Sequence, residues 1–156
     1  MYICSVVQRH NETRLSGPTE FIGISGLGTN SAELPADDPR SGFFGYSRTL
    51  RKEDIRDGLS TTLFAIETST DLGPWAAGGP STVRGVESDR LPFIGPNCQF
   101  GGNHKTDRGL FRWISHDCAT AAFVDGSVRF LNDSISRETL EALATIAGGD
   151  TPGDDY

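Results

Sequence analysis

The hydrophobic pattern of the chain is most regular in the stretch HDCATAAFVDGSVRFL, where two apolar, β-prone runs flank Asp125 and Gly126. An Asp-Gly pair readily adopts the positive φ angles of a tight hairpin turn. With a two-residue turn, Phe123 lies opposite Val128 and one face of the hairpin is wholly apolar. A slip of one residue would expose Phe123 and Phe130, so the pattern predicts a β-hairpin of defined register.

A helical pattern follows the hairpin. Ser136 is typical of a helix N-cap, and Glu138 suits the positive end of the helix dipole. Apolar residues then recur at helical spacing, at Leu140, Leu143, Ala144 and Ala147. Gly148 and Gly149 are expected to end this short helix.

The helix is expected to pack against the apolar face of the hairpin, because so short a helix needs tertiary contacts for its stability. Phe123, Phe130, Leu140 and Leu143 should then form one buried cluster. At a fully buried site, Phe130→Ala would lower the free energy of unfolding by about 3–5 kcal/mol. The acidic tail at 150–156 is expected to fray.

The rest of the chain predicts short strands joined by long loops. Strand candidates lie at residues 2–7, 20–25 and 63–67, one helical turn or capped loop at 51–58, an aromatic core segment at 42–46, and long loops at 26–41 and 68–96. With the hairpin and the helix, this predicts an α+β, β-rich fold, in which an antiparallel sheet carries five or six short strands.

The length of 156 residues predicts one domain, at residues 1–149, followed by the tail. The 19 Gly and 8 Pro favour irregular loops over a helical bundle. A net charge of −7 argues against binding to nucleic acid or to anionic membranes. No apolar run approaches a membrane span, and the N-terminus lacks a signal-peptide pattern. The chain is thus expected either to stay in the cytoplasm or to be part of a longer protein.

Ser115, His116 and Asp117 are the residue types of a catalytic triad, but consecutive residues of an extended segment point to opposite sides. They cannot form a relay among themselves, and no Gly-x-Ser-x-Gly elbow is present. The sequence therefore predicts no catalytic residues, and we expect the protein not to be an enzyme.

Two thiols and two imidazoles supply the ligand types of a structural zinc site, at Cys98, His104, His116 and Cys118. Their spacing matches no compact zinc motif. A Cys98–Cys118 disulfide is the second alternative, and the absence of any covalent or metal link is favoured over both. Cys4 is the third cysteine, and sequence alone does not fix its pairing.

Asp125 could ligate calcium through its carboxylate, although a hydrogen bond to its own turn is favoured. Asp54 and Asp57 could likewise bind a cation, but capping of the next turn is favoured. Trp75 and Trp113 could stack on a sugar, whereas tryptophans in loop-rich domains more often fill part of the core. The residues thus predict no cofactor, with calcium left open beside the zinc alternative.

Several segments in order carry a resemblance to a known family. These are GFFGY at 42–46, DIRDGLSTTL at 54–63 with Glu67 beyond, Trp75 with Gly78-Gly79, FVDGSVRFL at 123–131 and LATIAGG at 143–149. Cys4-Ser5 is similar to a Cys-Pro-Ser step without its proline. Together they resemble the planctomycete family of prepilin-like proteins of unknown function, whose C-terminal element is a His, nine residues, then Asp-Gly.

The chain departs from that pattern at two places. His116 is separated from Asp125 by eight residues, and Asp117-Cys118 replaces the usual Pro-Gly-Gly. Thr61 stands where the family prefers Asn. The motif residues that the resemblance implies as structural are Asp54, Asp57, Gly58, Glu67, His116, Asp125 and Gly126, with His116 and Asp125 also as metal candidates.

The resemblance implies a pilin-like globular domain without the N-terminal helix, related to pseudopilins and type IV pilins. It implies a non-enzymatic structural module, extracellular or in the cell envelope, whose partners are other pilin-like subunits or envelope components. Some pseudopilins bind calcium in a C-terminal loop, so the resemblance is also compatible with a bound cation. The alternative is an extracellular polysaccharide- or ligand-binding module, motivated by Trp75 and Trp113.

Overall fold

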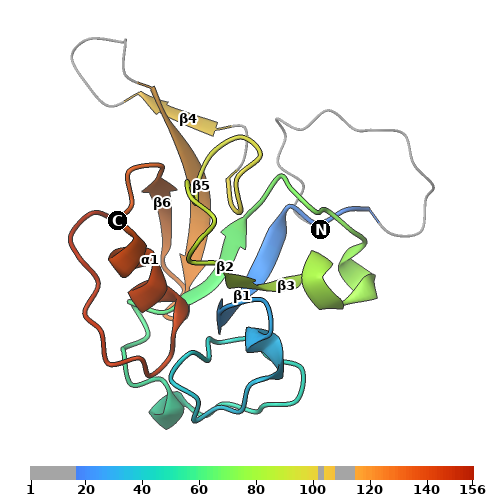
Figure 1. The fold of residues 1–156 in the computed structure, drawn as a ribbon, viewed down its shortest axis with the longest axis vertical. Helices are drawn as coiled ribbons and strands as arrows, with labels where there is room; N and C mark the ends of the chain where they lie inside the picture. Colours follow the sequence, from blue (N-terminus) through green and yellow to red (C-terminus); the bar gives the residue numbers. More distant parts are fainter. Residues whose placement is uncertain (1–16, 102–103, 108–114) are drawn as a thin grey trace.

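The computed structural model describes residues 17–101, 104–107 and 115–156. They form one six-stranded sheet and one α-helix, joined by long loops with four short 3₁₀ turns (Figure 1). The elements are β1 (Phe21–Leu27), β2 (Leu63–Glu67), β3 (Val83–Val86), β4 (His104–Asp107), β5 (Ser115–Phe123), β6 (Val128–Asn132) and α1 (Arg137–Ala144), with 3₁₀ turns at Ser31–Glu33, Lys52–Asp54, Trp75–Ala77 and Gly79–Ser81. The α+β, β-rich class with a C-terminal hairpin and helix is confirmed. The strand expected at residues 2–7 lies outside the described residues.

The sheet has the order β3-β1-β2-β5-β4, and β6 pairs with β5. Three strands pair with β5, namely β2, β4 and β6. Residues of β5 that pair with β2 or β4 also pair with β6, so β6 lies along the opposite edge of β5 from β2 and β4. The expected sheet was antiparallel throughout, but β1 and β3 are parallel. Between β2 and β3 the chain passes beside the residues that precede β1, where the Thr19 amide donates to the carbonyl of Gly73 at 3.1 Å.

One face of the sheet packs against α1 and the loop at 93–100, which together bury the core. The core consists of Ile22, Ile24, Leu63, Ile66, Val86, Phe93, Ile94, Phe100, Ala119, Ala121, Phe123, Leu131, Ile135, Leu140, Leu143 and Ala144. In β5 the buried residues Ala119, Ala121 and Phe123 occupy alternate positions, as a two-residue period requires. β1 is instead buried over residues 22–26, because both faces of this strand are covered. In the part that the structure describes, no helix is long and apolar enough to cross a membrane.

The aromatic segment at 42–46 covers the opposite face of the sheet instead of filling the core. The ring centroid of Phe64 lies 5.2 Å from that of Phe43 and 4.9 Å from that of Phe44. Gly23 of β1 makes room for this cluster, because a Cβ there would come within 2.5 Å of the Phe44 ring. The expectation of an aromatic core segment is therefore wrong, and Tyr46 is 52% exposed.

The loop at 26–41 is ordered by the guanidinium of Arg48. Its Nη1 donates to the carbonyls of Ser31 and Leu34 at 3.0 and 2.9 Å, and its Nη2 to the carbonyl of Ser25 at 2.8 Å. Burial lowers the pKa of Arg48. Because Ser25 belongs to β1 whereas Ser31 and Leu34 belong to a 3₁₀ turn and its C-cap, one side chain ties the loop to the sheet, although the sequence predicts a surface segment.

The hairpin turn differs from the expected one by one residue. The amide of Phe123 donates to the carbonyl of Ser127 at 2.9 Å, and the amide of Gly126 donates to the carbonyl of Phe123 at 3.0 Å. The loop therefore has three residues and ends on Gly126, whose φ is +87°. This is the arrangement in which a type I turn is followed by a left-handed glycine, and the predicted two-residue turn is wrong.

The extra loop residue shifts the register, so that Val128 pairs with Ala122 and Phe130 with Thr120. Val128 is 64% exposed and Phe130 54% exposed, whereas Phe123 is 2% exposed. The predicted cluster thus contains Phe123 and both leucines of α1, but not Phe130. The loss of unfolding free energy expected for Phe130→Ala is wrong as well, because that loss requires a buried side chain.

The start of α1 is as predicted, but its end is earlier. Ser136 caps the helix, with the Thr139 amide donating to its Oγ at 3.2 Å. The helix ends at Ala144, four residues before Gly148. The backbone of Ile146 instead pairs with other loops, accepting from the Arg56 amide at 2.7 Å. These tertiary hydrogen bonds hold the chain extended where the sequence would allow a further helical turn.

The C-terminal tail is docked, and the expectation that it frays is wrong. Asp155 accepts from the Ser136 amide at 2.7 Å and from the hydroxyl of Thr139. The guanidinium carbon of Arg129 lies 4.8 Å from the ring centroid of Phe123 and 5.1 Å from that of Tyr156. The tail therefore adds a carboxylate at the positive end of α1 and an aromatic ring beside the core.

The left-handed conformation of Gly126 predicts a strong dependence on side-chain shape. Gly126→Val places a β-branched residue at positive φ and should lower the free energy of unfolding by about 1–3 kcal/mol. Gly126→Asn is the matched control, because asparagine tolerates this region and no atom lies within 4 Å of a Cβ here. Urea unfolding of both variants checks this, and equal losses would contradict it.

The docked tail predicts a pH-dependent contribution to stability. The hydroxyl of Thr139 and then the Ser136 amide lower the pKa of Asp155. A lowered pKa stabilises the folded state above the unfolded value of about 3.9, and this is lost as the pH falls through the folded value. Asp155→Asn should therefore lower the melting temperature at pH 7, with a difference that shrinks below about pH 4. Asp154→Asn, at an exposed neighbour, should show no such trend.

Candidate functional site

Asp57 joins two motif segments that lie about 90 residues apart in the chain, as the separations of 91 and 92 show. Its Oδ2 accepts from the Gly148 amide at 2.8 Å, and its Oδ1 from the Gly149 amide at 3.0 Å. The hydroxyl of Thr145 adds a third hydrogen bond at 3.1 Å. The carboxylate thus caps the chain after α1, and the prediction that Asp57 caps the turn that follows it is wrong.

The same segment supports the hairpin turn. Gly58 has a φ of +101°, and the hydroxyl of Thr62 donates to its carbonyl at 2.8 Å. The amide of Asp125 donates to the carbonyl of Leu59, and that of Val124 to the carbonyl of Thr62, both at 3.0 Å. The loop before β2 is therefore the common support of the hairpin and of the chain beyond α1.

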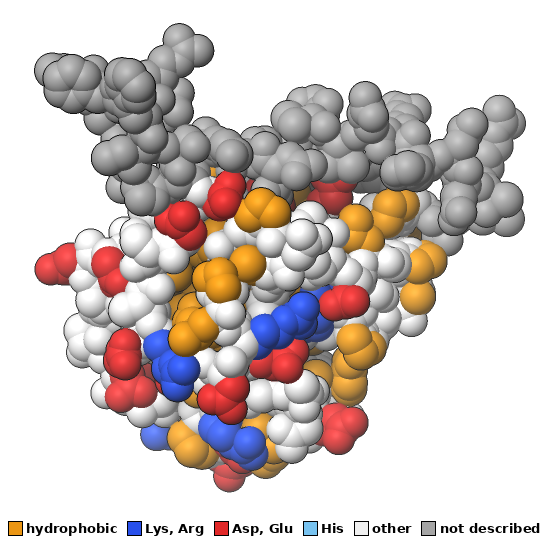
Figure 2. Space-filling view, turned by 45° about the horizontal axis from the view of Figure 1, so that its top comes forward, with side chains coloured by type: hydrophobic (Ala, Val, Ile, Leu, Met, Phe, Trp, Pro, Cys, Tyr) orange, Lys and Arg blue, Asp and Glu red, His pale blue; other side chains and the backbone are white. Residues whose placement is uncertain are grey.

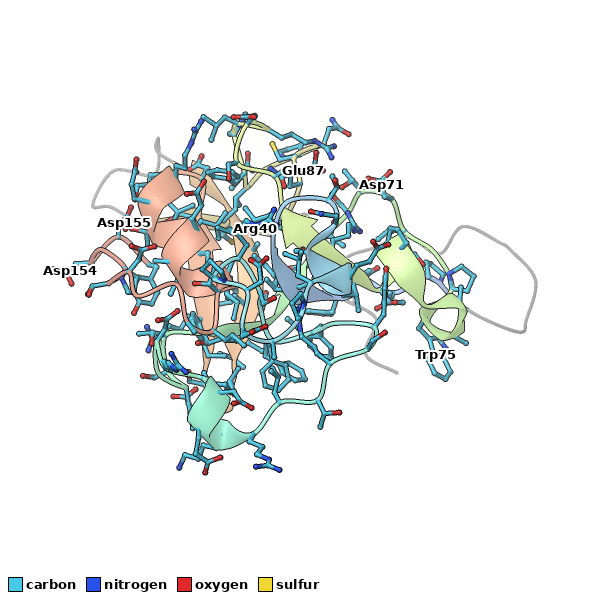
Figure 3. The ribbon with its side chains drawn as sticks, turned by 60° about the horizontal axis from the view of Figure 1, so that its bottom comes forward. Arg40, Asp71, Trp75, Glu87, Asp154 and Asp155 are labelled. Carbon is cyan, nitrogen blue, oxygen red and sulfur yellow. The ribbon has the colours of Figure 1, made fainter. Side chains whose placement is uncertain are left out.

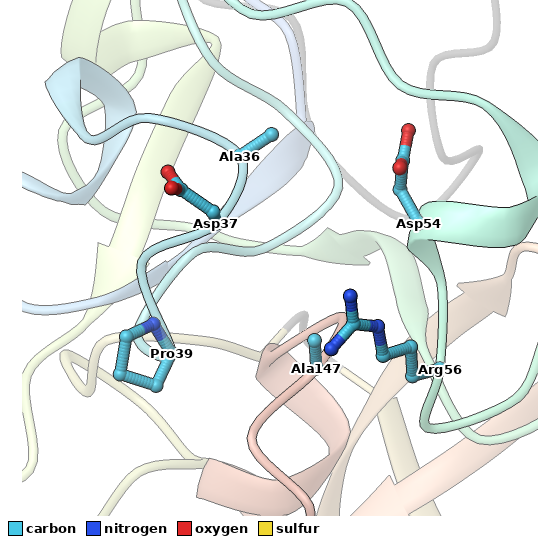
Figure 4. Close-up of a pocket in the computed structure, with 6 residues that line it drawn as sticks. All are labelled: Ala36, Asp37, Pro39, Asp54, Arg56 and Ala147. Carbon is cyan, nitrogen blue, oxygen red and sulfur yellow. The ribbon is translucent and has the colours of Figure 1, made fainter.

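Asp54 caps its own 3₁₀ turn, accepting from the Arg51 amide at 2.6 Å. It also lines a depression of about 180 Å³ with Asp37, Arg56 and Ala147 (Figure 4). In the close-up the guanidinium of Arg56 extends toward the centre of this depression from the side of Asp54. The hollow is small, and its charged side chains are Asp37, Asp54 and Arg56.

The carboxylate of Glu67 supplies a hydrogen-bond acceptor that the sheet lacks beside β5. It is 2% exposed, and its Oε2 accepts from the Thr120 amide at 3.1 Å. At this point β5 exchanges its partner, from β2 at Ala121 to β4 at Cys118. The carboxylate thus replaces a backbone acceptor that neither strand supplies, which is a structural role.

The two metal candidates of the hairpin do not meet. His116 pairs with Thr106 near the start of β5, whereas Asp125 lies in the turn beyond its end. At about 3.3 Å per residue they are roughly 25–30 Å apart. Among the described residues, no group of three or more His, Cys, Asp or Glu is placed to hold a metal.

Asp125 has the turn role that the sequence favours. Its Oδ1 accepts from the Ser127 amide at 2.8 Å, and the polar groups of Ser127 lower the pKa of Asp125. A calcium role for this residue stays a prediction.

No disulfide joins Cys98 to Cys118, so the alternative of a bridge between them is wrong. Burial raises the pKa of both thiols. The backbone places His104 opposite Cys118, but the imidazoles and Cys4 lie outside the part described in atomic detail. The zinc hypothesis therefore stays a prediction.

Of the two tryptophans proposed to contact a ligand, Trp113 lies outside the described residues. Trp75 is 62% exposed, on a 3₁₀ turn that projects from the body of the domain (Figure 3). The reading of Trp75 as a partial core plug is thus wrong, while a ligand contact stays a prediction. In Figure 3 its ring lies well away from Asp71 and Glu87.

A pocket lies beside β3, in a region where the sequence predicts only a loop. It has a volume of about 260 Å³, and its lining includes Thr29, Tyr46, Asp71, Pro80, Arg84 and Glu87. The Arg84 side chain is 15% exposed, and its Nη2 donates to the carbonyl of Thr70 at 2.9 Å. Burial lowers the pKa of Arg84, and the charge of Asp71 opposes this. The sequence signal for this pocket is the single arginine in the apolar segment Val83-Arg84-Gly85-Val86, which lies in a region that the sequence predicts to be a loop.

Comparison with known proteins gives one family assignment. Residues 8–138 match the model of the family described as "Protein of unknown function (DUF1559)". The chain belongs to this family. The match spans the segment around Asp57, Glu67 and the hairpin.

The chain is also similar to Phototropin-1A and Phototropin-1B of rice (Oryza sativa subsp. japonica), each 31% identical over 133 residues. The similarity covers 72% of this chain but only 14% of either plant protein. No solved structure matches the chain.

The three hydrogen bonds of Asp57 predict a large loss of stability in Asp57→Ala. Removing a charged acceptor from partly buried amides should cost about 2–3 kcal/mol. Asp54→Ala is the control, because it removes a single cap bond worth about 1 kcal/mol or less. Denaturant unfolding gives the energies, and hydrogen exchange at Gly148 and Gly149 should accelerate in Asp57→Ala alone. Equal losses in both variants would contradict the assignment.

Proposed function

We propose that this domain is a non-enzymatic, pilin- or pseudopilin-like structural module of the cell envelope or of an extracellular assembly. The resemblance to prepilin-like proteins supports this, as does the use of Asp57, Gly58 and Glu67 for internal support of the fold. The observation that carries the proposal is the free edge of β6.

Val128 and Phe130 present both apolar side chains and unpaired backbone groups at that edge. The backbone at the two ends of β6 bonds to β5 at Ser127 and at Asp133, whose partners are Phe123 and Asp117. In an antiparallel ladder every second residue bonds to a given neighbouring strand. The amides and carbonyls of Val128 and Phe130 therefore point away from β5. Among the described strands, β6 pairs with β5 alone. Edge strands usually carry charged residues or Pro that prevent pairing. β6 has no Lys or Pro, and its one charged residue, Arg129, lies against the rings of Phe123 and Tyr156. Such an edge suits a strand of a neighbouring subunit.

Site-specific cross-linking tests the proposal. A photoreactive amino acid at position 130, in protein made by its native cell, should form adducts with envelope proteins or with a second copy of the chain. The same substitution at position 91 is the control, because Leu91 is 57% exposed but lies in a loop. A folded protein whose adducts at 130 are absent, or match those at 91, would contradict the assembly role.

The second candidate function is an extracellular polysaccharide- or ligand-binding module. The exposure of Trp75 favours it, because an exposed indole ring on a projecting turn offers a stacking surface. Retention on immobilised polysaccharide, lost in Trp75→Ala, would support it, and no retention of the unmodified protein would remove it.

A further inference from the structure

The pocket lined by Thr29, Tyr46, Asp71, Pro80, Arg84 and Glu87, called here the Arg84 pocket, combines hydrogen-bonding groups of both kinds with an exposed aromatic ring. It lies beside β3, which is at the opposite edge of the sheet from β6. Its role can therefore be separated from the proposed assembly contact.

Arg84 has hydrogen-bonding capacity that the protein does not use. Its Nη2 is bonded to Thr70, and its Nε is buried without a partner among the described residues, out of reach of a ligand. Its Nη1 is 3.8 Å from Oδ2 of Asp71, which is beyond hydrogen-bond distance. A guanidinium carries five donors, and a ligand in the pocket would therefore be bonded through Nη1.

Two carboxylates beside Arg84 restrict the charge of that ligand. Asp71 has a side chain that is 69% exposed and a backbone φ of +52°. The side chain of Glu87 is 44% exposed, and its Oε1 lies 3.7 Å from Nη1 of Arg90, so the charges around the pocket balance. An anion would meet both carboxylates, and a cation would meet the guanidinium. A neutral molecule with several hydroxyls can accept from Arg84 and donate to Asp71 or Glu87.

Tyr46 adds a stacking surface at the pocket. It is 52% exposed, and its amide is held by the carbonyl of Ala32 at 2.9 Å. We propose that the Arg84 pocket binds one neutral sugar ring, with Arg84, Asp71 and Glu87 bonding its hydroxyls and Tyr46 covering its apolar face. The volume of about 260 Å³ is near the lower end of ligand pockets, which suits a single ring.

The test is an NMR titration of the intact chain with D-glucose, D-galactose, D-mannose and N-acetyl-D-glucosamine, each to about 50 mM, because a site for one ring should bind near the millimolar range. At least one sugar should shift the amides of Arg84, Gly85 and Glu87. Tyr46→Ala should weaken binding about tenfold or more without changing the melting temperature, since the ring is exposed. Trp75→Ala is the matched aromatic control and should bind as the unmodified chain does.

Three outcomes would overturn the proposal. No sugar shifts the pocket amides; the shifts fall around residue 75 and vanish in Trp75→Ala; or glycine at the same concentration competes for the pocket, which would assign it to a zwitterion. Glu87→Gln serves as a second variant in case Tyr46→Ala fails to fold, and it should weaken sugar binding too. None of these results bears on cross-linking at position 130.

Discussion

The carboxylate of Asp57 is the contact on which the C-terminal half of the fold depends. It accepts the amides of Gly148 and Gly149, while its own segment receives the hairpin turn through the carbonyls of Leu59 and Thr62. A buried backbone group needs a partner, and a chain that leaves a helix in extended form has many such groups. One loop therefore sets both where α1 ends and where the hairpin turns.

The position of the turn decides which surface the hairpin presents. Because the loop ends on a left-handed Gly126, the side chains of β6 are shifted by one place, and Leu131 enters the core in place of Phe130. Arg129 then lies against Phe123 and Tyr156, which draws the C-terminus onto the same face. The apolar edge of β6 is thus a direct result of turn geometry.

The two edges of the sheet differ in chemistry, and this separates the two proposed activities. At β6 the exposed groups are apolar side chains and free backbone groups, which suit another strand. At β3 they are a partly buried Arg84, two carboxylates and an exposed Tyr46, which suit a small hydroxylated ligand. On the face shown in Figure 2, acidic and basic side chains are interspersed, without a field of one sign.

The sequence by itself determined the class of fold, the bounds of β2, the cap at Ser136 and the existence of the hairpin, because local periodicity and capping chemistry decide these features. Only the tertiary structure decided the register of β6, the end of α1 and the partner of Asp57. A turn of two or three residues satisfies the same Asp-Gly pair, and the choice depends on hydrogen bonds that the turn amides donate to the carbonyls of residues 59 and 62. The Arg84 pocket escaped prediction for the same reason, since Tyr46, Asp71 and Arg84 come from separate segments and meet only when β3 pairs with β1.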